Sequence, residues 1–250
     1  MKYGICNIGK TPLRKEPNHK SELISEILYG ETFSIVSRKK NWVKVIIYWD
    51  EYEGWVNLNQ FLSITLKDFK LINSNNQKYL TDLIQYLECE NHQIFPVCMG
   101  SNIGASEYLN NYCEWTPKKV NKDIRSSIIT SAYKYLHSPY LWGGRSPFGI
   151  DCSGLTQMCY KLQGIKIKRD AWQQSEQGTT LSFIEESNPG DLAFFDDDEG
   201  KIIHVGILLK NNYIIHSHGK VRIDKIDQTG IFNINTNNHS HKLRLIKKIL

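Results

Sequence analysis

The sequence lacks any apolar run long enough to cross a membrane. A helix that spans a membrane needs about 18 consecutive apolar residues, and no segment of this 250-residue sequence approaches that length. The first residues, MKYGICNIGKTPLR, also lack the apolar stretch of a signal peptide. We therefore expect no membrane span and a cytoplasmic protein.

A large excess of one charge is missing as well. The 31 Lys and Arg residues stand against 26 Asp and Glu residues, the net charge is +5, and the lysines are scattered. Nucleic-acid binding typically requires basic residues clustered on one face. We therefore expect no nucleic-acid partner. The oligomeric state is left open.

Closely paired metal ligands are absent too. The six cysteines contain no CxxC, and neither HSH motif (His216 to His218, His239 to His241) has a close Cys pair beside it. Structural zinc usually takes such paired ligands. The loop LWGGRSPFG also lacks the Lys-Ser/Thr ending of a phosphate-binding loop. We expect free thiols, no metal and no cofactor.

The first 65 residues predict a small all-β domain. Short β-rich segments such as ETFSIVSR and NWVKVIIYW are separated by turn segments such as DEYEG, which is typical of a small barrel or sandwich. The order of PLR…P, GE, W.KV and GWV resembles a bacterial SH3-like domain. We assign residues 1–65 to such a domain.

Residues 66–120 form either a linker or a degenerate second SH3-like domain. Within NQKYLTDLIQYLECE, apolar side chains recur at helical spacing and predict a short amphipathic helix. These side chains are Tyr79, Leu80, Leu83, Ile84 and Leu87. The later segment QIFPVCMGS predicts a strand.

Residues 121–250 predict an α+β domain. Two segments with helical spacing, KDIRSSIITSAYKYLHS and DCSGLTQMCYKLQG, flank the loop YLWGGRSPFGI. The β-rich runs DLAFF, IIHVGILL, NYIIHS and KVRID follow, and HKLRLIKKIL supplies a last strand. Helices followed by consecutive strands indicate helices packed on an antiparallel sheet.

Cys152 opens the second predicted helix directly after a glycine-rich loop. The helix dipole and exposed backbone N–H groups stabilise a thiolate there, and together with His204 they predict thiolate character near neutral pH. A cysteine nucleophile also needs a base and a group that orients the base. His204 and His216 lie on adjacent predicted strands, and a hairpin through LKNN brings them together. His218 shares a face with His216 and is the alternative orienting residue.

The motifs YLWGG, DCSGL, PGDLAFF, HVGI and IIHS, in this order, resemble the NlpC-type family of papain-like bacterial cysteine peptidases. The spacings from Cys152 to His204 and on to His216 also look typical of that family. The resemblance implies a papain-like fold over residues 121–250. It also implies that Cys152 is the nucleophile, His204 the general base and His216 the residue that orients His204.

The same resemblance implies four substrate-site residues: Tyr140, Asp151, Ser153 and Asp170. In the subgroup that requires a free amino end, the acidic residue before the cysteine helps to recognise that amine. The segment RDAWQQ resembles the family's RD(S/A)..Q pattern. Ala171 stands where relatives often have Ser, so a side-chain hydrogen bond is missing at that position.

With its SH3-like region, the chain most resembles γ-D-glutamyl-L-diamino acid endopeptidases that act on cell-wall peptides. We expect a murein peptide with a free N-terminal L-Ala as substrate and a role in wall recycling. One alternative is a hydrolase of intact peptidoglycan in which the SH3-like module binds the wall. Another is an amidase or acyltransferase on the same fold.

Overall fold

The computed structural model describes residues 2–74, 77–115 and 123–250, and the chain divides into two compact units. Unit 1 comprises Met1–Lys119 and Trp142–Pro147, and unit 2 comprises Val120–Leu141 and Phe148–Leu250. Because a segment of unit 1 interrupts unit 2, a single cut cannot separate them. The domain boundary predicted between residues 120 and 121 lies outside the described residues.

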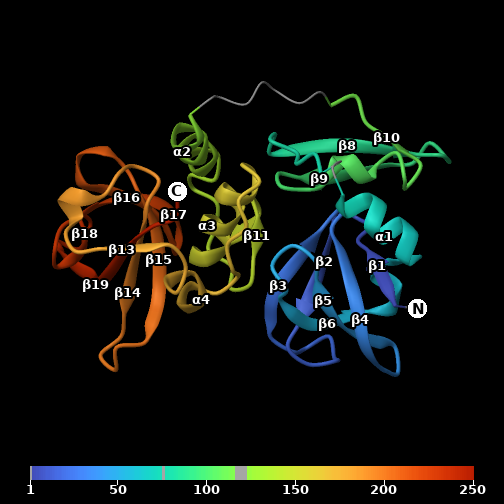
Figure 1. Cartoon of the computed structure of the whole chain (residues 1–250), viewed down its shortest axis with the longest axis horizontal. Coiled ribbons are helices and arrows are strands. Elements are labelled where there is room, and N and C mark those ends of the chain that lie inside the picture. Colours follow the sequence, from blue (N-terminus) through green and yellow to red (C-terminus); the bar gives the residue numbers. More distant parts are fainter. Residues whose placement is uncertain (1, 75–76, 116–122) are drawn as a thin grey trace. The chain divides into compact units, whose positions relative to one another are not determined.

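A seven-stranded antiparallel sheet forms the first part of unit 1 (Figure 1). In chain order its strands are β1 (Tyr3–Ile5), β2 (Lys10–Arg14), β3 (Leu23–Leu28), β4 (Thr32–Lys39), β5 (Trp42–Ile47), β6 (Glu53–Asn57) and β7 (Leu62–Ile64). The short helix η1 (Leu58–Gln60) follows β6. On β5, Val43, Val45 and Ile47 alternate into one core with Leu13 and Phe33. This is the small all-β domain that the sequence predicts.

The rest of unit 1 corrects one sequence prediction. Its elements are α1 (Leu66–Asn73), β8 (Ile84–Cys89), β9 (Ile94–Cys98), η2 (Ile103–Ala105) and β10 (Asn111–Tyr112). The helix predicted around Leu80 and Leu87 is wrong, because β8 pairs antiparallel with β9 and β10 there. In this sheet Leu80 and Leu87 are buried in one cluster with Tyr29. Pairing with partner strands therefore determines the structure of this segment, although the local spacing of its apolar residues suits a helix. The strand predicted in QIFPVCMGS is confirmed as β9.

The segment Trp142–Pro147 is held within unit 1 by charged groups. The Arg145 guanidinium donates to Glu31 over 2.9 and 3.0 Å and is fully buried. Its backbone N–H donates to a carboxylate oxygen of Glu26 over 2.9 Å, and the indole N–H of Trp142 donates to Glu22 over 2.8 Å. Residues Trp142–Pro147 of the motif YLWGGRSP are therefore a structural part of unit 1.

Unit 2 is built on a second seven-stranded sheet, whose order is β13-β19-β14-β15-β16-β17-β18. Its strands are β13 (Thr179–Leu181), β14 (Leu192–Asp196), β15 (Ile202–Leu208), β16 (Tyr213–His218), β17 (Lys220–Ile226), β18 (Gly230–Asn233) and β19 (Asn238–Lys248). An additional pairing of β18 with β19 closes six of these strands into a barrel. Phe195, Leu208, Ile214 and Ile231 belong to one hydrophobic core in this unit.

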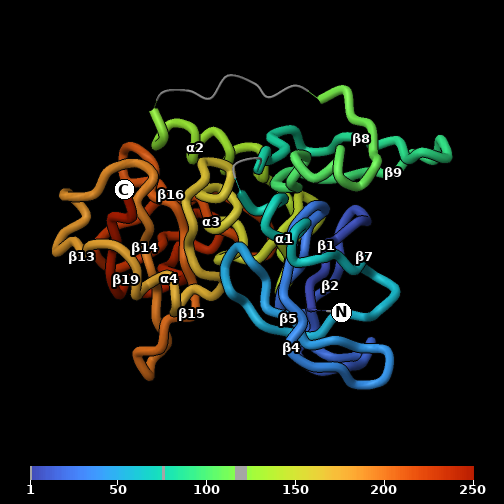
Figure 2. Tube along the Cα trace, turned by 45° about the vertical axis from the view of Figure 1, so that its right-hand side comes forward, coloured from blue at the N-terminus to red at the C-terminus, as the bar shows by residue number. Residues whose placement is uncertain are grey.

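Three helices lie on one side of these strands in Figure 1: α2 (Ile124–Lys134), α3 (Cys152–Lys161) and α4 (Ala171–Ser175). Figure 2 traces the chain from α3 and α4, in yellow, into the orange and red strands. The remaining short elements are β11 (Arg145–Ser146), β12 (Gly149–Ile150), η3 (Ile184–Glu186) and η4 (Lys210–Asn212). The α+β architecture with helices on an antiparallel sheet is confirmed; α4 was not predicted. No helix in the described ranges is long and apolar enough to span a membrane.

Candidate active site

Cys152 is the first residue of α3, and Asp151 caps that helix. The Asp151 carboxylate accepts a hydrogen bond from the Gly154 backbone N–H over 2.6 Å, which satisfies a free donor of the first helical turn. The backbone N–H groups of Ser153 and Val205 lie close enough to the Cys152 thiol to lower its pKa. Val205 lies in β15 directly after His204, and α3 packs on that strand, which carries the predicted base.

Cys152 is almost completely buried, with 7% of the residue's surface exposed. Burial raises its pKa to about 12, and the negative charge of Asp151 acts in the same direction. The backbone N–H groups of Ser153 and Val205 lower the pKa but do not offset the loss of water. The prediction of a thiolate near neutral pH is therefore wrong. A helix N-terminus stabilises a thiolate by about 0.3–1 kcal/mol, which is less than one pKa unit, whereas burial raises the pKa of a thiol by several units.

His204 on β15 and His216 on β16 are joined by a hydrogen bond. The distance from His204 Nε2 to His216 Nδ1 is 2.8 Å. In the antiparallel register His216 lies opposite Gly206. A Cβ atom at Gly206 would lie 3.0 Å from His216 Cβ and 2.7 Å from Ile214 Cδ1. The glycine thus provides the space in which the second histidine reaches the first.

Two further residues continue this chain of contacts, and the sequence analysis did not single them out. His216 Nε2 lies 2.9 Å from Asp224 Oδ2 on the neighbouring strand β17. The Arg222 guanidinium donates to both oxygens of Asp224, over 2.5 and 2.8 Å. In KVRID, alternation places Arg222 and Asp224 on one face. Only the register of β16 and β17 brings that face to His216.

The other two histidines near His204 contact it differently. The ring of His241, from β19, stacks on that of His204 at a centroid distance of 4.2 Å and an interplanar angle of 25°. The centroid of the His218 ring is 6.5 Å from that of His204. Of the two predicted partners, the structure therefore places His216, rather than His218, in hydrogen-bond contact with His204.

Both histidines of the hydrogen-bonded pair favour the neutral form. Burial lowers the pKa of His204 well below 6.5, and His216 and His241 lower it further. Burial also lowers the pKa of His216, although the hydrogen bond with Asp224 opposes this shift. Within the part of the chain that the structure describes, no group of three or more His, Cys, Asp or Glu side chains has the geometry to hold a metal ion.

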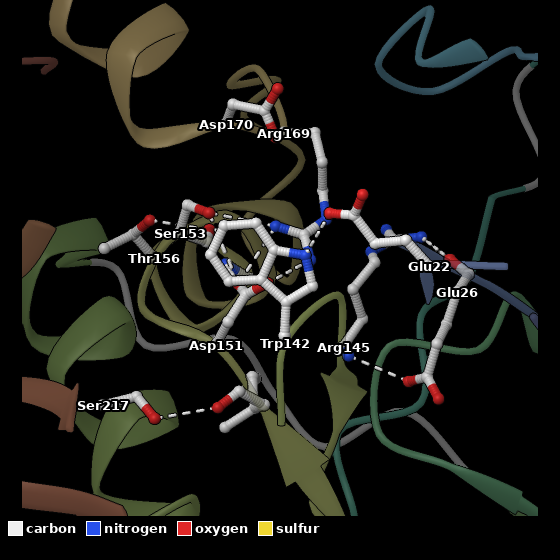
Figure 3. Close-up of polar contacts among 12 residues, drawn as sticks. Glu22, Glu26, Trp142, Arg145, Asp151, Ser153, Thr156, Arg169, Asp170 and Ser217 are labelled. Atoms are coloured by element: carbon white, nitrogen blue, oxygen red, sulfur yellow. Dashed lines mark hydrogen bonds and ion pairs between the residues drawn. The ribbon is translucent and has the colours of Figure 1, made fainter. Parts of the chain in front are cut away.

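Among the predicted substrate residues, Asp151 and Ser153 form one cluster around Arg169 (Figure 3). The Arg169 guanidinium donates to both Asp151 oxygens, over 3.0 and 2.6 Å, and to Ser153 Oγ over 3.0 Å. Arg169 opens the segment RDAWQQ, so the motif contained a signal for it that the sequence analysis did not use. Asp170 precedes α4, and its carboxylate points away from this cluster in Figure 3.

Tyr140, the fourth predicted substrate residue, lies near the nucleophile. A bridge pairs its backbone with that of Ile150, two residues before Cys152. Burial raises the pKa of the Tyr140 phenol, and the nearby Cys152 and Asp151 groups raise it further. The phenol therefore stays protonated at neutral pH and is available as a hydrogen-bond donor.

A cysteine at the start of a helix that packs on a strand whose histidine bonds to a second histidine is the arrangement expected of a papain-like cysteine peptidase. Comparisons with known proteins give the same class and narrow it. A family model described as "NlpC/P60 family" matches residues 137–237. A second, described as "Bacterial dipeptidyl-peptidase Sh3 domain", matches residues 13–61.

Two relatives align with most of this chain. The γ-D-glutamyl-L-lysine dipeptidyl-peptidase of Bacillus cereus is 29% identical over 79% of this chain and 68% of its own length. Dipeptidyl-peptidase 6 of Lysinibacillus sphaericus is 28% identical over 86% of this chain and 89% of its own. A crystal structure of an NlpC/P60 family protein from Bacillus cereus matches 99% of both chains with a TM-score of 0.78 and 20% identity, which shows the shared fold. The chain is thus a cysteine peptidase with an NlpC/P60 domain and a bacterial SH3 domain.

Proposed function

We propose that the protein hydrolyses the bond between γ-D-glutamate and an L-diamino acid in peptides derived from peptidoglycan. The observation that carries this proposal is the hydrogen-bonded His204–His216 pair, whose first member lies on the strand β15 against which α3 packs with the buried Cys152 at its start. The specific bond is supported by the name of the Bacillus cereus relative, which is similar to this chain across both units. The diamino acid is diaminopimelate or lysine.

In the proposed reaction, the Cys152 sulfur attacks the γ-glutamyl carbonyl carbon while the thiol proton passes to His204. The carbon–nitrogen bond then breaks, and the leaving amine takes that proton from His204. This leaves a thioester on Cys152. Water attacks the thioester with His204 as base, which releases the carboxylic acid and restores the thiol. His216 orients the His204 ring throughout.

A neutral Cys152 thiol and a neutral His204 imidazole in the resting enzyme are compatible with this sequence of steps. Because burial raises the pKa of Cys152 and lowers that of His204, the proton moves when the substrate is attacked. Tyr140 and Asp151 lie beside the thiol and form part of the proposed substrate site. Since Arg169 already holds both oxygens of Asp151, a substrate amine would share that carboxylate with Arg169.

We further propose that the peptidase prefers peptides with a free N-terminal L-Ala and acts in the recycling of wall peptides in the cytoplasm. Both named relatives are dipeptidyl-peptidases, which supports a requirement for a free amino end. Fractionation of cells followed by immunoblotting would test the location. A protein found only outside the cytoplasm would contradict the recycling role.

The activity is tested with L-Ala-γ-D-Glu-diaminopimelate, its lysine analogue, and the same peptides attached to N-acetylmuramic acid, with mass spectrometry of the products. We expect release of the L-Ala-γ-D-Glu dipeptide from the free peptides. Cys152→Ala should abolish it. The matched variant Cys159→Ala, which changes another buried cysteine of α3, should retain it.

The other outcomes identify the alternative functions. Cleavage of the muramyl peptides in preference to the free ones would indicate a hydrolase of the intact wall. Transfer of the acyl group to an added amine would indicate an acyltransferase. Activity that survives in Cys152→Ala would contradict the proposed nucleophile.

A further inference from the structure

The hydrogen bonds behind the proposed catalytic pair determine where its protons lie. His216 uses one ring nitrogen, Nδ1, toward His204 and the other, Nε2, toward Asp224. Asp224 is 2% exposed and holds the Arg222 guanidinium through both carboxylate oxygens. All four residues belong to unit 2 and come from the adjacent strands β15, β16 and β17 (Figure 1).

Asp224 is ionised, because a guanidinium can only donate hydrogen bonds and contacts both of its oxygens. Burial alone would raise the pKa of this carboxyl, but hydrogen bonds from His216 and Arg222 lower it overall. An ionised carboxylate accepts hydrogen bonds and cannot donate one. His216 must therefore carry a proton on Nε2 and donate it to Asp224.

The proton on His216 Nε2 fixes the next hydrogen bond. A neutral imidazole has one N–H group and one lone pair, so the Nδ1 atom of His216 is an acceptor. Burial favours this neutral form, and the positive Arg222 neutralises the charge that would otherwise favour an imidazolium. His204 then donates from Nε2 to His216, which leaves Nδ1 as its only nitrogen able to take a proton.

We propose that Asp224, clamped by Arg222, is a positioning residue of this peptidase that selects the tautomer of His216 and, through it, makes His204 Nδ1 the basic atom. The inference rests on the proposed roles of Cys152 and His204. It adds a residue that touches neither thiol nor substrate. Because Arg222 neutralises Asp224, the pair acts by directing hydrogen bonds rather than by placing net negative charge near the histidines.

The first test reads the tautomers directly in the unaltered protein. Long-range ¹H–¹⁵N correlation spectra of ¹⁵N-labelled protein distinguish protonated from unprotonated ring nitrogens, with signals assigned from single-histidine variants. We expect a protonated Nε2 and an unprotonated Nδ1 on both His204 and His216. A proton on Nδ1 of His216 would overturn the inference, and the tautomers themselves are read in the wild-type protein.

The second test replaces Asp224 with Asn, which has nearly the same shape. In the wild type, Asp224 Oδ2 accepts from both His216 Nε2 and Arg222 Nε, and Oδ1 accepts from Arg222. The amide places an NH2 group at one of these two positions, so it faces a donor of Arg222 or turns His216 Nε2 into an acceptor, and the tautomer is no longer fixed by two oxygens. We expect kcat to fall on the order of 10- to 100-fold, as when other buried orienting groups are removed, with little change in KM. The histidine signals should move toward the other tautomer. A purely structural role would instead lower the unfolding temperature and leave the tautomers of the folded fraction unchanged.

Asp227→Asn is the matched control, because Asp227 contacts His239, a histidine on the same sheet that is not bonded to His204, His216 or Asp224. It should leave kcat and the His204 and His216 signals unchanged. If Asp224→Asn also retained the wild-type kcat and tautomers, the inference would be wrong even though the peptidase proposal stands. Failure of the peptidase proposal itself would be seen in a different result, namely activity that is retained in Cys152→Ala.

Discussion

Cys152 and His204 both lie where little water reaches them, and this sets their resting charges. A cysteine thiol and a histidine imidazole can form an ion pair, and the position of Cys152 at a helix start favours its anionic form. Burial instead favours the neutral form of both groups, because it raises the pKa of the thiol to about 12 and lowers that of His204. Since each pKa unit is worth about 1.4 kcal/mol, desolvation outweighs the helix dipole.

The raised thiol pKa predicts how Cys152 reacts with iodoacetamide. Because only the thiolate reacts, its alkylation rate should rise roughly tenfold per pH unit between pH 7 and 9 without reaching a plateau. Mass spectrometry of the peptide that contains Cys152 measures this rate, with Cys152→Ser as the control for the assigned signal. A rate already constant below pH 7 would show a stable thiolate and contradict the effect of burial.

At the scale of elements, the pairing of β15 with β16 brings the two histidines together. Their side chains meet because the antiparallel register sets Gly206 opposite His216. Any other residue at position 206 would place a Cβ atom against β16. The glycine is therefore required by the close approach of neighbouring side chains rather than by an unusual backbone angle.

Gly206→Ala should reduce activity more than stability. The added methyl group contacts Ile214 Cδ1 and His216 Cβ, and such overpacking costs about 1–3 kcal/mol. We expect kcat to fall because His216 is displaced from His204, while denaturant unfolding shows a modest loss of stability. Combining the change with Ile214→Val removes the Cδ1 atom but leaves Cγ1, 2.8 Å from the added Cβ, so it should recover part of the stability but not kcat. Recovery of both would mean that the His216 contact is harmless.

At the scale of the whole molecule, the chain passes between its two units more than once. After α2 it enters unit 1 for the six residues Trp142–Pro147 and then returns to form α3 with Cys152. Within unit 1, Arg145 is fully buried and paired with Glu31, and its backbone N–H and guanidinium also bond to Glu26. The fold of unit 1 therefore depends on residues that lie far beyond its main segment in the sequence.

Arg145→Met should destabilise the protein strongly. The substitution leaves the buried Glu31 carboxylate without its guanidinium, and removing one partner of a buried ion pair costs about 3–5 kcal/mol. Chemical denaturation of the full chain, followed by tryptophan fluorescence, measures the loss. The double variant Arg145→Met, Glu31→Gln should be less destabilised than the single one, because it leaves no unpaired charge. Equal stability of wild type and Arg145→Met would contradict this account.

Much of the fold follows from patterns that the sequence carries locally. Strand alternation, helix spacing and turn residues predicted the first β domain, the helix that begins at Cys152 and the strands that carry His204 and His216. These succeeded because the buried face of each element repeats with that element's own period. The segment around Leu80 and Leu87 failed for the same reason, since its spacing suits a helix while its partner strands make it a sheet.

The sequence by itself determined which residue types were present for thiol chemistry and, through ordered motifs, the family to which they belong. The tertiary structure decided the rest. Strand register placed His216 rather than His218 against His204 and brought Asp224 behind it. Packing buried Cys152 and raised the pKa of its thiol to about 12, against the predicted thiolate. Register and burial depend on segments distant in the chain, so no local pattern records them.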